Sequence, residues 1–235
     1  MVVILFKILM VGTELDAYKL IYFDKIPSTQ DQAYDLIASG SVKNRTVIVA
    51  NTQTSGRGRF KRNWVSRPGN LYASFIYKID EHNPKIAYSV GVAVAETLIS
   101  FGITPQIKWP NDILIDGKKI SGILIEYAQN FVIIGIGVNI ANCPKIKDYK
   151  TTKMNNFTDA SVSDVLNVLM KKIDKWTRCD FKLVRGRWME LAFGINKIIT
   201  YHGDSFELIG INETGALVLR KDTKYILTYG DEISI

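Results

Sequence analysis

Cysteine and histidine are scarce in this chain of 235 residues, which contains only two of each. Cys143 and Cys179 have neither the spacing of a metal motif nor the number that a disulfide framework needs. His82 and His202 are far apart in sequence, so we expect neither a histidine-ligated zinc site nor a Ser-His-Asp triad. A reducing, cytoplasmic environment is the simplest interpretation, and we expect no metal held by a dedicated set of side chains.

Long apolar runs are also missing, since no segment approaches the roughly 18 apolar residues of a membrane-spanning helix. The N-terminal stretch MVVILFKILMVG is apolar, but Lys7 interrupts it and no cleavage site of the Ala-x-Ala type follows. We therefore expect a buried strand or an apolar interface segment there rather than a signal peptide, and no association with a membrane.

Acidic residues are absent from Ser55 to Ile79, where six basic residues account for much of the net charge of +7. The core of this stretch is G-R-G-R, Gly56 to Arg59, in which glycines allow backbone N–H groups to approach an anion and arginines offer forked donors. It lacks the Gly-Lys-Ser/Thr of a Walker A loop and the third glycine of a dinucleotide fingerprint. By itself it fits a phosphate-binding loop, a nucleic-acid arm or a solvated basic turn.

The remaining pattern indicates an α+β protein. Strands are expected over 19–26, 45–53, 70–79 and 130–140. Helices are expected over 30–39, with Ser28 or Thr29 as N-cap and Gly40 just past the C-terminal end, and from Asn83-Pro84 onward. A third helix is expected behind the S-V-S-D capping box at 161–164, with an apolar face of Val165, Leu169, Ile173 and Trp176. After about residue 190 only short strands follow. We therefore expect a catalytic domain at 1–190 and a small β domain at 191–235, which is too small to be very stable without docking.

A hairpin is expected at Asp116-Gly117, between two apolar strands. Because side chains alternate along a strand, a two-residue turn places Asp112, Lys119 and Ser121 on one face. A surface ion pair worth little is the plain alternative. The apolar residues on both sides of the pair favour a functional one.

These segments together resemble biotin protein ligases. The resemblance rests on IPSTQ, TQTSGRGRFKRNW, GNLYASF, IKWPNDILI, KKISGILIE and GIGVNI in this order, followed by the small β module, and it covers about residues 20 to 235. Lys-Trp-Pro-Asn-Asp followed by Lys-Ile-Ser-Gly-Ile-Leu-Ile-Glu is its most specific part. The members that the chain resembles are short ones without an N-terminal DNA-binding domain.

The resemblance implies a class II synthetase-like catalytic domain, with a mixed sheet and flanking helices, and a C-terminal SH3-like barrel. It also implies that biotin and ATP, with Mg²⁺, give biotinyl-5′-AMP, and that a lysine of a biotin carboxyl carrier protein domain then takes the biotin. A homodimer is expected, and nucleic acid is not. The implied catalytic residues are Lys119 and Arg59. The implied biotin contacts are Ser28, Thr29, Gln30, Gln53, Gly56, Arg57, Tyr72, Ser74, Lys119 and Gly122, and the implied ATP or adenylate contacts are Arg57, Arg59, Trp64, Asn111, Asp112, Gly137 and Asn139.

Two features depart from the family pattern. Gln30 stands where these ligases usually have asparagine, and Phe60-Lys61 replaces the residues that usually follow the second arginine of the basic loop. An acyl-adenylate hydrolyses in water, so a glycine-rich basic loop that closes over it suits this chemistry. A lipoate–protein ligase is the nearest alternative, and a non-catalytic nucleic-acid binder is a more distant one.

Overall fold

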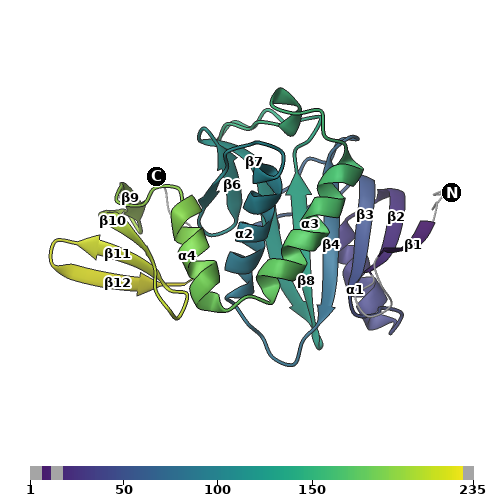
Figure 1. Cartoon of the computed structure of the whole chain (residues 1–235), viewed down its shortest axis with the longest axis horizontal. Coiled ribbons are helices and arrows are strands. Elements are labelled where there is room, and N and C mark those ends of the chain that lie inside the picture. The colour runs from purple at the N-terminus through teal and green to yellow at the C-terminus, as the bar shows by residue number, and fades with distance from the viewer. Residues whose placement is uncertain (1–6, 12–17, 230–235) are drawn as a thin grey trace. The chain divides into compact units, whose positions relative to one another are not determined.

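The computed structural model describes residues 7–11 and 18–229, and it has the predicted α+β fold (Figure 1). Contacts divide the chain into two compact units, one of residues 1–82 and 120–165 and the other of residues 83–119 and 166–235. Of the apolar N-terminal segment, only the backbone of β1 (Lys7–Val11) is described, and it is a strand. Whether that segment is buried lies outside the described residues.

The first unit contains a mixed sheet whose strands lie in the order β1-β2-β3-β4-β8-β7. Strands β2 and β3 are parallel, and the other neighbours in this order are antiparallel. Their sequences are rich in β-branched and aromatic residues, which favour strands. The bounds are β2 Tyr18–Ile26, β3 Thr46–Gln53, β4 Leu71–Lys78, β7 Lys118–Ala128 and β8 Phe131–Val138.

Helix α1 (Thr29–Ala38) packs on one face of this sheet. Ser28 caps its N-terminus, because the Ser28 side chain accepts hydrogen bonds from the N–H groups of Gln30 and Asp31. Gly40 ends the helix in the left-handed conformation, with a φ of 66°. Ala33 and Ile37 are buried in a cluster with sheet residues that include Ile48, Ile76 and Ile133. The predicted helix and both of its ends are confirmed.

In the second unit, α2 (Ile86–Ile99) begins two residues after the predicted proline. The Asn83 side chain accepts a hydrogen bond from Lys85 N–H, so a turn precedes the helix. The short strands β5 (Gln106–Lys108) and β6 (Asp112–Ile115) are antiparallel. Helix α4 (Phe181–Leu191) was not predicted; it packs on α2, where Trp188 contacts Tyr88 edge-to-face.

Helix α3 (Val162–Thr177) has the predicted capping box. Asp164 N–H donates to Ser161 Oγ, and the Asp164 carboxylate accepts from Ser161 N–H. Its first four residues belong to the first unit and the rest to the second. The expected apolar side chains of this helix are buried, namely Val165, Leu169, Ile173 and Trp176.

Four antiparallel strands form the C-terminal sheet, in the order β12-β11-β10-β9. The sheet docks on the helices of the second unit, since Tyr88 of α2 donates to Gly215 O over 2.6 Å and Arg185 of α4 donates to Ile211 O over 2.6 Å. This agrees with the β module expected from the sequence, while the exact domain boundary at residue 190 stays a prediction. The strands are β9 Ile198–Tyr201, β10 Asp204–Ile211, β11 Leu217–Lys221 and β12 Lys224–Thr228.

Candidate active site

A floor of glycines lies on the face of the first unit's sheet that α1 partly covers. Strand register places Tyr72 opposite Gly137, and Gly137 opposite Gly122, so these three residues share one face. Gly135 follows on the same face, opposite Ser74. With no side chains at three positions, this part of the sheet lets another group approach the backbone closely.

Two side chains lie directly against the backbone of these glycines. A Cβ atom at Gly135 would lie 2.7 Å from the Gln30 Oε1 atom, and one at Gly137 would lie 2.5 Å from the Trp64 indole. Both distances are shorter than real Cβ contacts, so Gln30 and Trp64 occupy space that any other residue would fill. Gly135 was not predicted as a site residue, although the motif GIGVN contains it.

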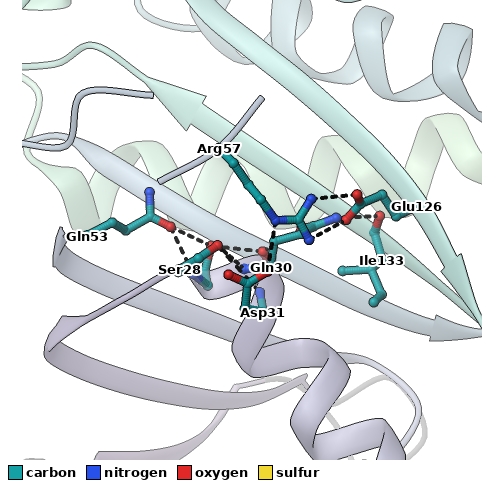
Figure 2. Close-up of polar contacts among 9 residues, drawn as sticks. Ser28, Gln30, Asp31, Gln53, Arg57, Glu126 and Ile133 are labelled. Carbon is teal, nitrogen blue, oxygen red and sulfur yellow. Dashed lines mark hydrogen bonds and ion pairs between the residues drawn. The ribbon is translucent and has the colours of Figure 1, made fainter. Parts of the chain in front are cut away.

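A network of neutral polar groups adjoins the glycine floor (Figure 2). The Gln53 Oε1 atom accepts from Thr29 N–H over 2.8 Å and from the Thr29 hydroxyl over 3.2 Å. Ser74 Oγ lies 2.9 Å from both Thr29 Oγ1 and Gln30 Oε1, and the Gln30 amide donates to Ile133 O. The longer amide of Gln30 is thus accommodated in full, at 3% exposure.

The basic stretch folds into a small hairpin from Gly56 to Trp64. Trp64 N–H donates to Gly56 O and Gly58 N–H donates to Arg62 O, both over 2.8 Å. A Cβ atom at Gly56 would lie 2.6 Å from Trp64 O, so the hairpin needs glycine there. At the tip, Phe60 is exposed and has a φ of 54°, and the Arg59 guanidinium lies 5.0 Å from the Phe60 ring centroid. A non-glycine residue with positive φ is uncommon, so this tip is a strained turn.

Arg57 does not point away from the protein. Its guanidinium contacts both carboxylate oxygens of Glu126 on β7, over 2.5 and 2.9 Å, and its Nε donates to Asp31 on α1 over 2.8 Å (Figure 2). The hydrogen bonds that Arg57 donates to Glu126, followed by the one that it donates to Asp31, outweigh burial and raise the pKa of Arg57 above its ordinary value. Neither acid was predicted, although Glu126 closes the motif KKISGILIE.

Asn139 and Asn70 organise the end of β8. Asn139 is 2% exposed; its amide donates to Thr152 O, and its Oδ1 atom has no hydrogen-bond partner among residues 18–229. A buried acceptor of this kind suits a ligand donor. Asn70 was not predicted: its Oδ1 atom accepts three backbone N–H groups, those of residues 140, 141 and 142, each over 2.9 Å. It therefore fixes the loop that follows Asn139.

Tyr72 has its hydroxyl occupied within the first unit. The hydroxyl donates to Arg67 O over 2.9 Å, and burial raises its pKa. The Tyr72 ring, rather than its hydroxyl, is thus what borders the glycine floor.

In the second unit, the predicted hairpin is confirmed. Asp116 and Gly117 have φ values of 49° and 70°, as a type I′ turn requires. Lys119 Nζ lies 2.7 Å from Asp112 Oδ1, and the two side chains are 16% and 25% exposed. Asn111 is half-buried beside them in the sequence, whereas Lys118 is exposed. The structure therefore brings Asp112 and Lys119 together and excludes Lys118 from the pair.

The predicted site residues accordingly fall into two groups. The first unit assembles a glycine floor, a neutral polar network and a basic hairpin, a combination that suits a polar, uncharged ring next to an anionic group. The second unit holds Lys119 paired with Asp112, and Asn111 precedes Asp112 in the sequence. Among residues 7–11 and 18–229, no three His, Cys, Asp or Glu side chains cluster to hold a metal ion. No helix in the same part of the chain is long and apolar enough to cross a membrane.

Comparison with known proteins agrees with this geometry. The pattern of the Biotin/lipoate A/B protein ligase family matches residues 22–139. The chain belongs to this family. It is 32% identical to the bifunctional ligase/repressor BirA of Bacillus subtilis, over 95% of this chain and 76% of that protein. It is also 29% identical to a biotin–[acetyl-CoA-carboxylase] ligase of Mycobacterium tuberculosis, over 68% and 67% of the two chains.

Solved structures lead to the same family. The biotin protein ligase of Aquifex aeolicus, solved in complex with biotin and ATP, superposes with a TM-score of 0.82 at 27% identity and covers 92% of this chain and 97% of its own. The fold predicted from the family resemblance is thus confirmed. The roles of single residues stay predictions.

Proposed function

We propose that this protein is a biotin protein ligase, which activates biotin with ATP and transfers it to a lysine of a biotin carrier domain. The observation that carries the proposal is the network in which the buried Thr29, Gln30 and Ser74 and the half-buried Gln53 meet beside the glycine floor. Neutral hydroxyl and amide groups match the donors and acceptors of biotin's ureido ring. The dithiolane ring of lipoate offers no such groups, and polar side chains buried against it would lose hydrogen bonds.

The first chemical step is adenylation. An oxygen of the biotin carboxylate attacks the α-phosphorus of ATP; the bond from that phosphorus to the bridging oxygen breaks, and pyrophosphate leaves with the electron pair. Negative charge grows on the non-bridging oxygens during attack, and fixed cations stabilise it. We assign this role to Lys119, held by Asp112, and to Arg59 in the hairpin.

The second step is acyl transfer. The neutral amine of the carrier lysine attacks the acyl carbon of biotinyl-5′-AMP, and the bond to the phosphate oxygen breaks. AMP leaves with the electron pair, and the amine loses a proton as the amide forms. The enzyme must exclude water until the carrier arrives. The hairpin from Gly56 to Trp64, with its indole against Gly137, is the element that we assign to this task.

The remaining contacts follow from the family resemblance. We assign Ser28 to the biotin ring, Tyr72 and Gly122 to the wall and floor of the biotin pocket, and Gly56 to the hairpin base. Asn139, whose Oδ1 atom has no hydrogen-bond partner in the described part of the chain, and Asn111 are assigned to the adenylate. A Mg²⁺ ion is expected to arrive bound to ATP, held by few protein ligands.

The partners and location stay predictions. We expect a biotin carboxyl carrier protein domain as the macromolecular substrate, a homodimer, and a cytoplasmic location. Sedimentation of the purified protein with and without biotin and ATP measures the oligomeric state.

The experiment that tests the function is a comparison of acids. The protein is incubated with MgATP and either radiolabelled biotin or radiolabelled lipoate, and the adenylate is separated by thin-layer chromatography. An adenylate from biotin alone supports the proposal, and an adenylate from lipoate alone makes the protein a lipoate ligase. Tight, salt-dependent binding of duplex DNA, with neither adenylate formed, would favour a nucleic-acid binder.

A further inference from the structure

Arg57 connects three elements of the first unit. It lies on the hairpin from Gly56 to Trp64, Glu126 lies on β7, and Asp31 lies in the first turn of α1 (Figure 2). Within the hairpin, Arg57 pairs with Asn63 across the two short arms. Because a guanidinium is planar, bonds on two of its edges fix both its position and its orientation. The base of the hairpin is therefore held to the sheet and to the helix.

The charges of this cluster argue against phosphate binding by Arg57. One positive guanidinium faces two carboxylates, so the group of three carries a net charge of about −1 when all are ionised. Three of its five N–H donors are already used by those carboxylates. A phosphate that approached the guanidinium would have to displace a carboxylate and then face its repulsion.

We propose that Asp31, Arg57 and Glu126 form a latch that positions the hairpin, so that Arg57 is a positioning residue and not a ligand of the phosphate. The identity of the ligand that the hairpin covers rests on the proposed function. It leaves Arg59, at the hairpin tip, as the arginine that meets the anionic ligand. The latch acts through Gly56 and Trp64, because the fixed hairpin base holds these two residues beside Gln53 and Gly137.

The two roles of Arg57 predict opposite results for Glu126→Gln. If Arg57 holds the latch, this substitution loosens the hairpin, and bound adenylate escapes faster. If Arg57 binds phosphate, the substitution removes a competitor, and the adenylate is held as well as before or better. The glutamine keeps the shape of the side chain and removes only the charge.

The first measurement is the release rate of biotinyl-adenylate, formed on the enzyme and chased with unlabelled ligand. Arg57→Ala and Glu126→Gln are each expected to speed release by about 5- to 20-fold, as suits a charge-assisted pair that is only partly buried. The double variant should be no faster than the worse single variant, because both remove the same interaction. Unchanged or slower release in Glu126→Gln, or fully additive effects, overturns the latch.

The second measurement needs no substrate. Trypsin cleavage within residues 57–62 reports opening of the hairpin, and Glu126→Gln keeps every basic cleavage site. We expect cleavage to be about 5- to 20-fold faster than in the wild type. An equal rate contradicts the latch. If the wild type formed no adenylate, the proposed function would fail, and the cleavage rate would still decide whether the latch exists.

Glu207→Gln is the matched control. Glu207 pairs with Arg220 in the C-terminal sheet and has a side-chain exposure of 23%, close to the 25% of Glu126. It should change neither adenylate release nor cleavage in the hairpin. Should Glu126→Gln fold poorly, Asp31→Asn provides a milder test, because it removes the charge of the carboxylate that accepts only one of the three hydrogen bonds of the latch. A smaller acceleration of both rates is then expected. The absence of any acceleration would count against the proposal.

Discussion

Replacing Lys119 by alanine is the sharpest test of the catalytic assignment. Lys119 Nζ lies 2.7 Å from Asp112 Oδ1 on a hairpin with a two-residue turn, so its position is fixed before any ligand binds. Its side chain is 16% exposed, which limits screening by solvent. Lys118 precedes it in the sequence, yet it is exposed.

The size of the effect follows from electrostatics. One cation at about 4 Å from one full negative charge gains about 4 kcal/mol at an effective dielectric constant of about 20. The transition state adds a fraction of a charge, in a site that closure makes less polar than this. We therefore expect Lys119→Ala to slow adenylate formation by about 10²- to 10³-fold, which corresponds to about 2.7–4 kcal/mol.

The assay is biotin-dependent release of pyrophosphate, with the affinity for biotin alone measured by calorimetry. In Lys119→Ala, the release of pyrophosphate should be much slower. Much of the affinity for biotin should remain, since the biotin ring is assigned to Gln53 and its neighbours. Lys118→Ala is the control and should change the release of pyrophosphate and the affinity for biotin very little. If Lys118→Ala greatly slows the release of pyrophosphate and Lys119→Ala does not, the catalytic assignment is wrong.

Three further outcomes are expected. Asn70→Ala leaves three backbone N–H groups without their acceptor and should lower the free energy of unfolding by about 2–4 kcal/mol, measured by urea denaturation; a loss below about 0.5 kcal/mol would contradict this role. Gly137→Ala places a methyl group where the Trp64 indole lies, so ATP should bind at least tenfold more weakly and tryptophan fluorescence should change; normal binding with unchanged fluorescence would refute the contact. Adenylate formation should stop in excess chelator and return with Mg²⁺, and full turnover without the ion would show that ATP needs no Mg²⁺ here.

Features with short, fixed spacing were predictable from the sequence. The Ser28 cap, the left-handed Gly40 and the Asp116-Gly117 turn depend on residues within a few positions of one another, and the structure contains all three. The alternation of side chains then placed Asp112 beside Lys119. Local steric rules decide such features, so a single sequence is enough to find them.

Features that depend on distant residues were missed. Arg57 lies 26 residues from Asp31 and 69 from Glu126, and nothing in the basic stretch itself indicates two acidic partners. Asn70 likewise holds N–H groups about 70 residues away along the chain. Helix α4 was not predicted because its apolar period is weak: Gly186 interrupts the pattern and Leu183 is exposed. The Asp180 cap was a usable signal for the start of this helix.

Modification of a carrier domain tests the central claim most directly. The protein is incubated with MgATP, biotin and a biotin carboxyl carrier domain, and the intact mass of the carrier is measured. We predict a gain of one biotin less one water on a single lysine, abolished by omitting ATP and not reproduced with lipoate. An unmodified carrier in the presence of biotin, or modification by lipoate in its place, would contradict the account.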